Sequence, residues 1–184
     1  MRACRTLWSS GGRDPWSLCS RSSRIPIEER RLMENDDAGS SEVERLSAMS
    51  VEAETYISSF SWAPPIVERT CCFGIGDIMA IFMFKFARPI DETTDRLWVI
   101  VGDLPSAYLV VDDADDARQA TERYCDLMQN WCEAVEHEGN LSEVYPVRAP
   151  STKENADLLR KRILFVRDEL LPTIPLDCPS GGPI

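Results

Sequence analysis

The chain has 184 residues, which is enough for one domain with a hydrophobic core but short for two domains with polar ends. It carries 31 acidic against 20 basic residues, so its formal net charge is −11. Such a surface repels phosphate groups, and no run of about 18 apolar residues occurs, so neither nucleic acid nor a membrane is an expected partner. A basic protein surface would be attracted instead.

The seven cysteines predict packing residues rather than a metal or redox site. They form no Cys-x-x-Cys pair, which disfavours a zinc site. The first residues contain no continuous apolar segment before a small-residue cleavage site, so no secretory signal is predicted. We therefore expect a cytoplasmic location with reduced thiols, and no metal or cofactor.

The N-terminal part of the chain differs in charge from the rest. Residues 1–31 have a net charge of +4, so the remainder has −15. Residues 1–48 are predicted to be a disordered extension, because their few apolar positions do not offset the entropy of ordering. Three interpretations of this extension stay open: an organellar transit peptide, a flexible arm, or translation that starts at Met33 or Met49.

A short helix and a hairpin are predicted next. Ser50 is the predicted N-cap of a helix over 50–59, because acidic residues follow in its first turn. Apolar runs over 67–73 and 78–87 flank a glycine-rich turn and predict a hairpin. Period-two alternation sets the faces of the second strand, with Phe82, Phe84 and Phe86 on one and Ile81, Met83 and Lys85 on the other.

Two more strands and a long helix follow. The apolar runs 97–101 and 107–111 are close enough in sequence to pair as an antiparallel meander. Residues 114–138 repeat apolar positions at helical spacing after the acids Asp112 and Asp113, which offer an N-cap. Gly139 then ends the helix.

A second long helix is predicted over 152–171. Ser151 and Glu154 have the spacing of a capping box, and Pro172 ends the helix. Residues 172–184 form a predicted disordered Pro/Gly tail, so the domain spans 49–171. The predicted fold class is α+β: a four-stranded, mainly antiparallel meander sheet covered by the two long helices, with the short N-terminal helix packed at an edge.

Three patterns that are often associated with catalysis or ligand binding have simpler structural explanations. The single histidine, His137, falls near a helix C-terminus, where its charge complements the helix dipole. Gly74 and Gly76 lack the third glycine and the following helix of a phosphate loop. The acids between 112 and 116 lack the EF-hand spacing and suit a helix start. We therefore predict no catalytic residue and no metal site.

Asp103 is the strongest candidate for a binding residue. It lies in the short link between two apolar strands, where binding loops usually sit, although an Asx-turn explains the same acid. Trp98 and Tyr108 on the adjoining strands complete the surface that we expect to bind. Asp77 and Cys72 are further candidates. For the vicinal pair Cys71 and Cys72, adjacent strand residues point to opposite faces, so one of the two thiols must lie outside the core.

Four segments resemble a group of small bacterial hypothetical proteins that has no assigned activity. Their sequences are WAPPI (62–66), FGIGDIMAIF (73–82), LWVIVGDLPSAYLVVDDA (97–114) and VYPV (144–147). The resemblance spans 60–171. It implies a bacterial cytoplasmic protein and transfers no site residues.

Two functions from different classes are compatible with these features. The first is a non-enzymatic acidic interaction module, such as an immunity-like or antitoxin-like protein that covers a basic protein surface. The alternative is a small enzyme or ligand-binding protein in which Asp103, Asp77, Glu68 or Cys72 meet in a pocket. Exposed acids around an apolar centre favour the first function, and a deep pocket with raised carboxylate pKa values favours the second. An exposed strand edge would also allow a homodimer.

Overall fold

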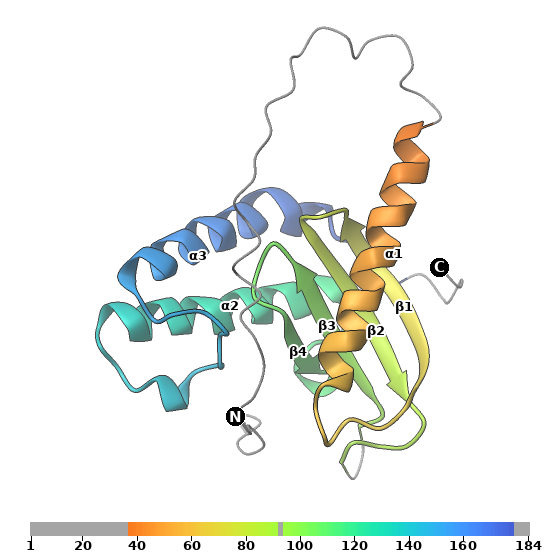
Figure 1. The fold of residues 1–184 in the computed structure, drawn as a ribbon, viewed down its shortest axis with the longest axis horizontal. Coiled ribbons are helices and arrows are strands. Elements are labelled where there is room, and N and C mark those ends of the chain that lie inside the picture. The colour runs from red at the N-terminus through yellow and green to blue at the C-terminus, as the bar shows by residue number, and fades with distance from the viewer. Residues whose placement is uncertain (1–36, 92–93, 179–184) are drawn as a thin grey trace, which may run out of the picture.

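The computed structural model describes residues 37–91 and 94–178, which form three layers: a helix, a sheet and two further helices (Figure 1). The sheet has four antiparallel strands that neighbour one another in chain order. This architecture confirms the predicted α+β class. The strands are β1 (Ile66–Ile75), β2 (Met79–Phe86), β3 (Arg96–Gly102) and β4 (Ala107–Val110).

The first helix, α1 (Asp37–Ser58), packs across one face of the sheet. Met49, Ala53 and Ile57 recur four residues apart on one side of the helix and are buried against this face. The predicted helix over 50–59 therefore begins too late and is misplaced, because Ser50 lies buried inside α1 and the helix does not pack at an edge. The disorder predicted for 1–48 is wrong for 37–48, and residues 1–36 lie outside the described part.

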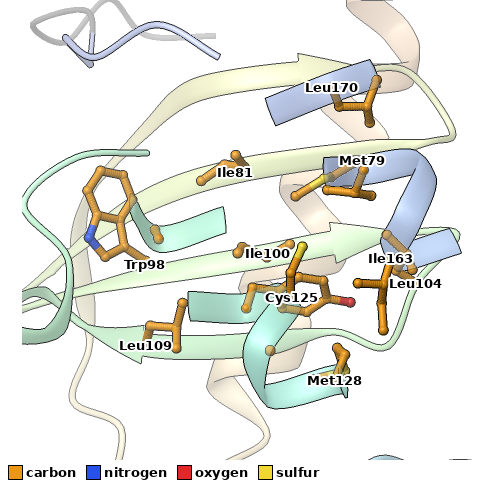
Figure 2. Close-up of a cluster of buried hydrophobic side chains, with 14 of the residues drawn as sticks. Met79, Ile81, Trp98, Ile100, Leu104, Leu109, Cys125, Met128, Ile163 and Leu170 are labelled. Carbon is orange, nitrogen blue, oxygen red and sulfur yellow. The ribbon is translucent and has the colours of Figure 1, made fainter. Parts of the chain in front are cut away.

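The other face is covered by α2 (Ala117–Glu136) and α3 (Lys153–Phe165), as Figure 1 shows. Figure 2 shows the core between them and the sheet, where Ile81, Trp98 and Ile100 meet Cys125 and Met128. The helix α3 continues as one π-helical turn, η4 (Val166–Leu170), and a 3₁₀ turn, η5 (Leu171–Thr173). Two shorter 3₁₀ turns precede α2 and α3, η2 (Val111–Asp113) and η3 (Leu141–Glu143).

The ends of the two long helices are defined by hydrogen bonds one or a few residues from the predicted positions. The N-cap of α2 is Asp116, whose carboxylate accepts from Gln119 N at 2.8 Å, and not Asp112 or Asp113. The N-cap of α3 is Thr152, which follows the predicted Ser151.

The C-terminal end of α2 is a Schellman-type turn. His137 is the C-cap, Glu138 takes the left-handed conformation at φ 52°, and Gly139 N donates to Ala134 O at 2.7 Å. The predicted stop at Gly139 is therefore close, but the left-handed residue is Glu138.

The glycines of the β1–β2 turn allow α1 to approach the sheet. The Glu42 carboxylate of α1 accepts a hydrogen bond from Gly76 N at 2.7 Å. A Cβ atom at Gly74 would lie 2.4 Å from the Leu46 side chain, and one at Gly76 would lie 2.7 Å from Arg45 Cβ. Close packing of a helix explains this Gly-x-Gly pattern without a phosphate ligand.

The C-terminal residues that follow η5 are part of the folded domain. Ile174 is completely buried, and Cys178 forms a disulfide with Cys72 of β1. The predicted domain end at 171 and the predicted disorder from 172 are therefore wrong for residues 172–178, because a buried apolar side chain and a cross-link hold them. Residues 179–184 lie outside the described part.

Replacement of Gly102 by alanine should strongly destabilise the fold. Gly102 has φ +138°, and a Cβ atom there would lie 2.3 Å from the carbonyl oxygen of Ile78, the residue before β2. We expect G102A to lower the free energy of unfolding by at least about 2 kcal/mol, because both the backbone conformation and the strand contact must change. Urea unfolding measures the loss.

G139A is the matched control, because a Cβ atom at Gly139 would meet its nearest neighbours at an ordinary 3.5 Å. We expect G139A to change stability by less than about 0.5 kcal/mol. Equal losses in the two variants would contradict the assignment of strain to Gly102.

Candidate functional site

Asp103 lies in the β3–β4 turn and is fixed by both its backbone and its side chain. Its N–H donates to Ile78 O at 2.9 Å. Its carboxylate accepts from Arg162 of α3, with Nη2 to Oδ2 at 2.9 Å and Nε to Oδ2 at 3.1 Å. The predicted Asx-turn thus does not describe the contacts of this side chain, which forms a forked ion pair across two elements.

A small pocket lies beside this ion pair. It encloses about 320 Å³ of space between atoms, part of it open solvent. Its walls are mostly apolar, with the Asp103–Arg162 pair and Asn155 at the polar edge. The residues that line it are Asp103, Pro105, Trp131, Val147, Ala149, Asn155, Leu158, Leu159 and Arg162.

One wall of the pocket, the loop that carries Val147, is attached to the sheet by tyrosines. The Tyr145 hydroxyl lies 3.1 Å from the Tyr56 hydroxyl of α1 and accepts from Tyr108 N of β4 at 3.2 Å. The Tyr108 ring in turn packs against Phe60, with the two ring centroids 5.2 Å apart. These contacts occupy the backbone N–H of Tyr108 on the outer strand of the sheet, and they hold the loop in place.

Trp98 and Tyr108 do not share a surface, contrary to our expectation. Trp98 points into the core under α2 and is only 1% exposed, and its Nε1 donates to Ala114 O at 2.9 Å. Tyr108 points to the opposite face, toward α1. The two residues lie in paired strands but one position out of register, since Trp98 pairs with Leu109 and Tyr108 with Val99. Side-chain alternation therefore separates them.

Asp77 and Asp103 lie at the same end of the sheet but contact helices on opposite faces of it. Asp77 sits in the β1–β2 turn with φ 62°, and its Oδ2 lies 3.9 Å from Arg45 Nε of α1. Asp103 instead faces α3 through Arg162. Glu68 is an exposed residue of β1. The structure therefore does not bring the predicted carboxylates together.

Cys72 is bound to Cys178 in a disulfide, so the prediction of a reduced thiol is wrong for this pair. The vicinal Cys71 lies on the other face, as expected, and contributes to the core under α1. Burial raises the pKa of the Cys71 thiol, and desolvation raises that of Cys125 to about 11. Neither thiol is therefore activated as a nucleophile at neutral pH.

Sequence reasoning missed Arg162, Tyr145 and Leu158, which complete the site. Arg162 is 59 residues from Asp103 in sequence, and no local pattern connects the two. A signal for Leu158 does exist. The run LLRKRILF in α3 places apolar residues side by side, so one helix face cannot bury them all.

The pocket is lined by few ionisable side chains. Its lining contains no cysteine, serine, threonine or histidine, and its single carboxylate is engaged by Arg162. Within the described residues, no group of three or more His, Cys, Asp or Glu side chains could hold a metal ion. Among the helices of the described residues, none combines the length and the apolar character needed to cross a membrane. Comparisons of the chain with protein families, curated proteins and solved structures found no match.

The tyrosine attachment of the loop should make stability fall at alkaline pH. Burial raises the pKa of the Tyr56 hydroxyl above its ordinary value of 10.0, so the folded state favours the neutral phenol. The unfolded phenol ionises near 10, and the free energy of unfolding should therefore decrease as pH rises above about 10.

The variant Y56F isolates this effect. At pH 7 it should be less stable than the natural chain by about 1 kcal/mol, because the hydrogen bond to Tyr145 is lost. The difference should shrink or reverse by pH 11, since Phe cannot ionise. Urea unfolding at both pH values measures it, and a constant difference would contradict the burial of a neutral Tyr56.

Proposed function

We propose that this protein is a non-enzymatic, acidic interaction module of the cytoplasm that covers a basic surface of a partner protein, as an immunity protein or antitoxin does. The observation that carries the proposal is the outward face of α3 and η4, where exposed acids surround exposed apolar side chains. The basic character of the partner follows from the charge of the described surface.

The outward face of α3 and η4 consists of residues that share one side of the helix and are all exposed. Leu158 is 45% exposed, Leu164 51% and Phe165 45%, which is unusual for large apolar side chains on one element. Leu158 also lines the Asp103 pocket, so the face and the pocket are continuous. The acids around them are Glu154, Asp157, Asp168 and Glu169.

Most basic residues of this helix are turned toward acids of neighbouring elements. Arg160 pairs with Glu136 of α2, Arg162 with Asp103, and Arg167 with Asp126 at 2.7 Å. These pairs neutralise the arginines within the fold. Among the outward acids, Asp157 also lies 3.5 Å from Arg160 Nη1. The exposed cations of this helix are Lys153 and Lys161, so the four outward acids still outnumber them, and a basic partner would supply further positive charge.

The described residues as a whole have a net negative charge, like the outward face of α3. Their side chains, in 41–91 and 94–178, include 24 acidic and 13 basic residues. A surplus of this size accelerates encounter with a basic partner, and the apolar residues at the centre of the face then supply contact area that excludes water. This division of roles fits an interaction protein better than an enzyme.

The proposal predicts a salt-sensitive complex that depends on this face. The immobilised full chain should retain a basic protein from a bacterial lysate at about 50 mM salt. Release of that protein should require a salt concentration on the order of tenfold higher. The affinity of the purified partner should then fall at least tenfold, about 1.4 kcal/mol, for the variant E154Q/D168N/E169Q.

The matched control E133Q/E138Q/E143Q removes the same charge near the C-terminal end of α2 and should change the affinity by less than about threefold. Failure to recover any basic protein, or equal losses in both variants, would contradict a docking role of the α3 face. Thermal unfolding of each variant confirms that the substitutions leave the fold intact.

A further inference from the structure

Residues 171–178, which we call the strap, run from the end of η4 to β1 across the core that α2 and α3 cover. The strap begins as η5 and buries Ile174 completely. It is joined to β1 by the Cys72–Cys178 disulfide, which links positions separated by 106 residues. Much of the strap is otherwise exposed, including Leu176 at 59%.

A single arginine provides the polar attachment of the strap. Arg118, in the first turn of α2, donates from Nη2 to Ile174 O at 2.9 Å and to Pro172 O at 3.3 Å, and from Nε to Ile174 O at 3.3 Å. The strap is therefore held by three kinds of contact: the apolar side chains of Leu171 and Ile174, the Arg118 guanidinium and the disulfide. The disulfide is the only covalent one of the three.

The remaining described thiols are poor candidates for exchange with this bond. Cys71 lies on the opposite face of the sheet, and Cys125 and Cys132 of α2 are buried in the core. Cys178, in contrast, is only half-buried, whereas Cys72 is 4% exposed. An external thiol can therefore reach the disulfide at the Cys178 sulfur.

We propose that the strap is a redox-controlled closure of the core, opened when a dithiol reduces the Cys72–Cys178 bond. One thiolate of the dithiol attacks Sγ of Cys178, the S–S bond breaks, and Cys72 leaves as a thiolate that takes up a proton. The second thiol of the reductant then displaces Cys178 from the mixed disulfide. The products are two protein thiols and one oxidised dithiol, with two electrons and two protons transferred to the protein.

Reduction leaves the apolar contacts of Leu171 and Ile174 and the hydrogen bonds of Arg118 to hold the strap. The segment is near the end of the described chain and contains no helix beyond its 3₁₀ turn, so it opens without breaking strand pairing. Opening exposes the side of the core between β1 and the first turn of α2. The inference goes beyond the interaction role, because it concerns neither the outward face of α3 nor a partner.

The proposed cytoplasmic location adds a physiological reason. Disulfides in reducing compartments are usually transient and respond to redox conditions. There the strap would be open at rest and would close under oxidation. This step rests on the proposed location, whereas the opening itself is a property of the purified chain.

Hydrogen exchange of the full chain, oxidised and with excess dithiothreitol, tests the strap. Trypsin should first release residues 70–85 linked to 168–184 from the oxidised protein, because cleavage follows Arg69, Lys85 and Arg167. Reduction should then increase exchange in 171–178 at least tenfold while β3 stays protected. C178S should exchange like the reduced chain under both conditions.

C71S is the matched control, because it removes the neighbouring thiol and leaves the disulfide intact. It should show the same linked peptides and the same response to reduction as the natural chain. Three results would overturn the proposal: no linked peptides, equal exchange of the strap in both redox states, or loss of protection in β3 together with the strap. The last would mean that the disulfide supports the whole domain rather than one segment.

Discussion

The structure depends on one constraint, which is that the central strands β2 and β3 are apolar on both faces. Met79 and Ile81 point to one side of β2, and Phe82 and Phe84 to the other, and all four are completely buried. An antiparallel sheet with one apolar face needs a single cover, but a sheet with two needs a cover on each side. The helix α1 therefore occupies one face, and α2 with α3 the other.

The two-sided cover also decides which residues can act together. Turns at one end of the sheet are close in space, yet each faces a different layer. Asp77 contacts Arg45 of α1, while Asp103 pairs with Arg162 of α3, so two acids that neighbour each other along the sheet end never meet. A surface pocket in this fold is accordingly formed by one turn of the sheet and the helices on one face. The pocket beside Asp103 lies between the β3–β4 turn and the layer of α2 and α3.

Local patterns predicted much of the fold, and longer-range contacts account for the rest. The faces of Phe82, Phe84 and Phe86 followed from alternation, and the turn reading of the Gly-x-Gly pattern agrees with its packing against α1. The nearly continuous apolar run of β2 already indicates a cover on each face, so the predicted position of the N-terminal helix at an edge is inconsistent with this run. Arg162 and the Cys72–Cys178 bond could not be foreseen, because they join positions 59 and 106 residues apart through tertiary packing alone.

In helix α3, the contacts that hold the helix in the fold leave its outward face exposed. Its inward stripe, which includes Leu159 and Ile163, is buried in the core, and its arginines reach sideways to acids of adjacent elements. These contacts hold the helix in the fold. The exposed side chains of Leu164 and Phe165 contribute little to that packing. A segment that keeps large apolar side chains in water departs from the pattern of a stable surface helix, and such departures are expected where a protein contacts something else. The contacts of the fold therefore do not explain why large apolar side chains lie on the outward face of α3.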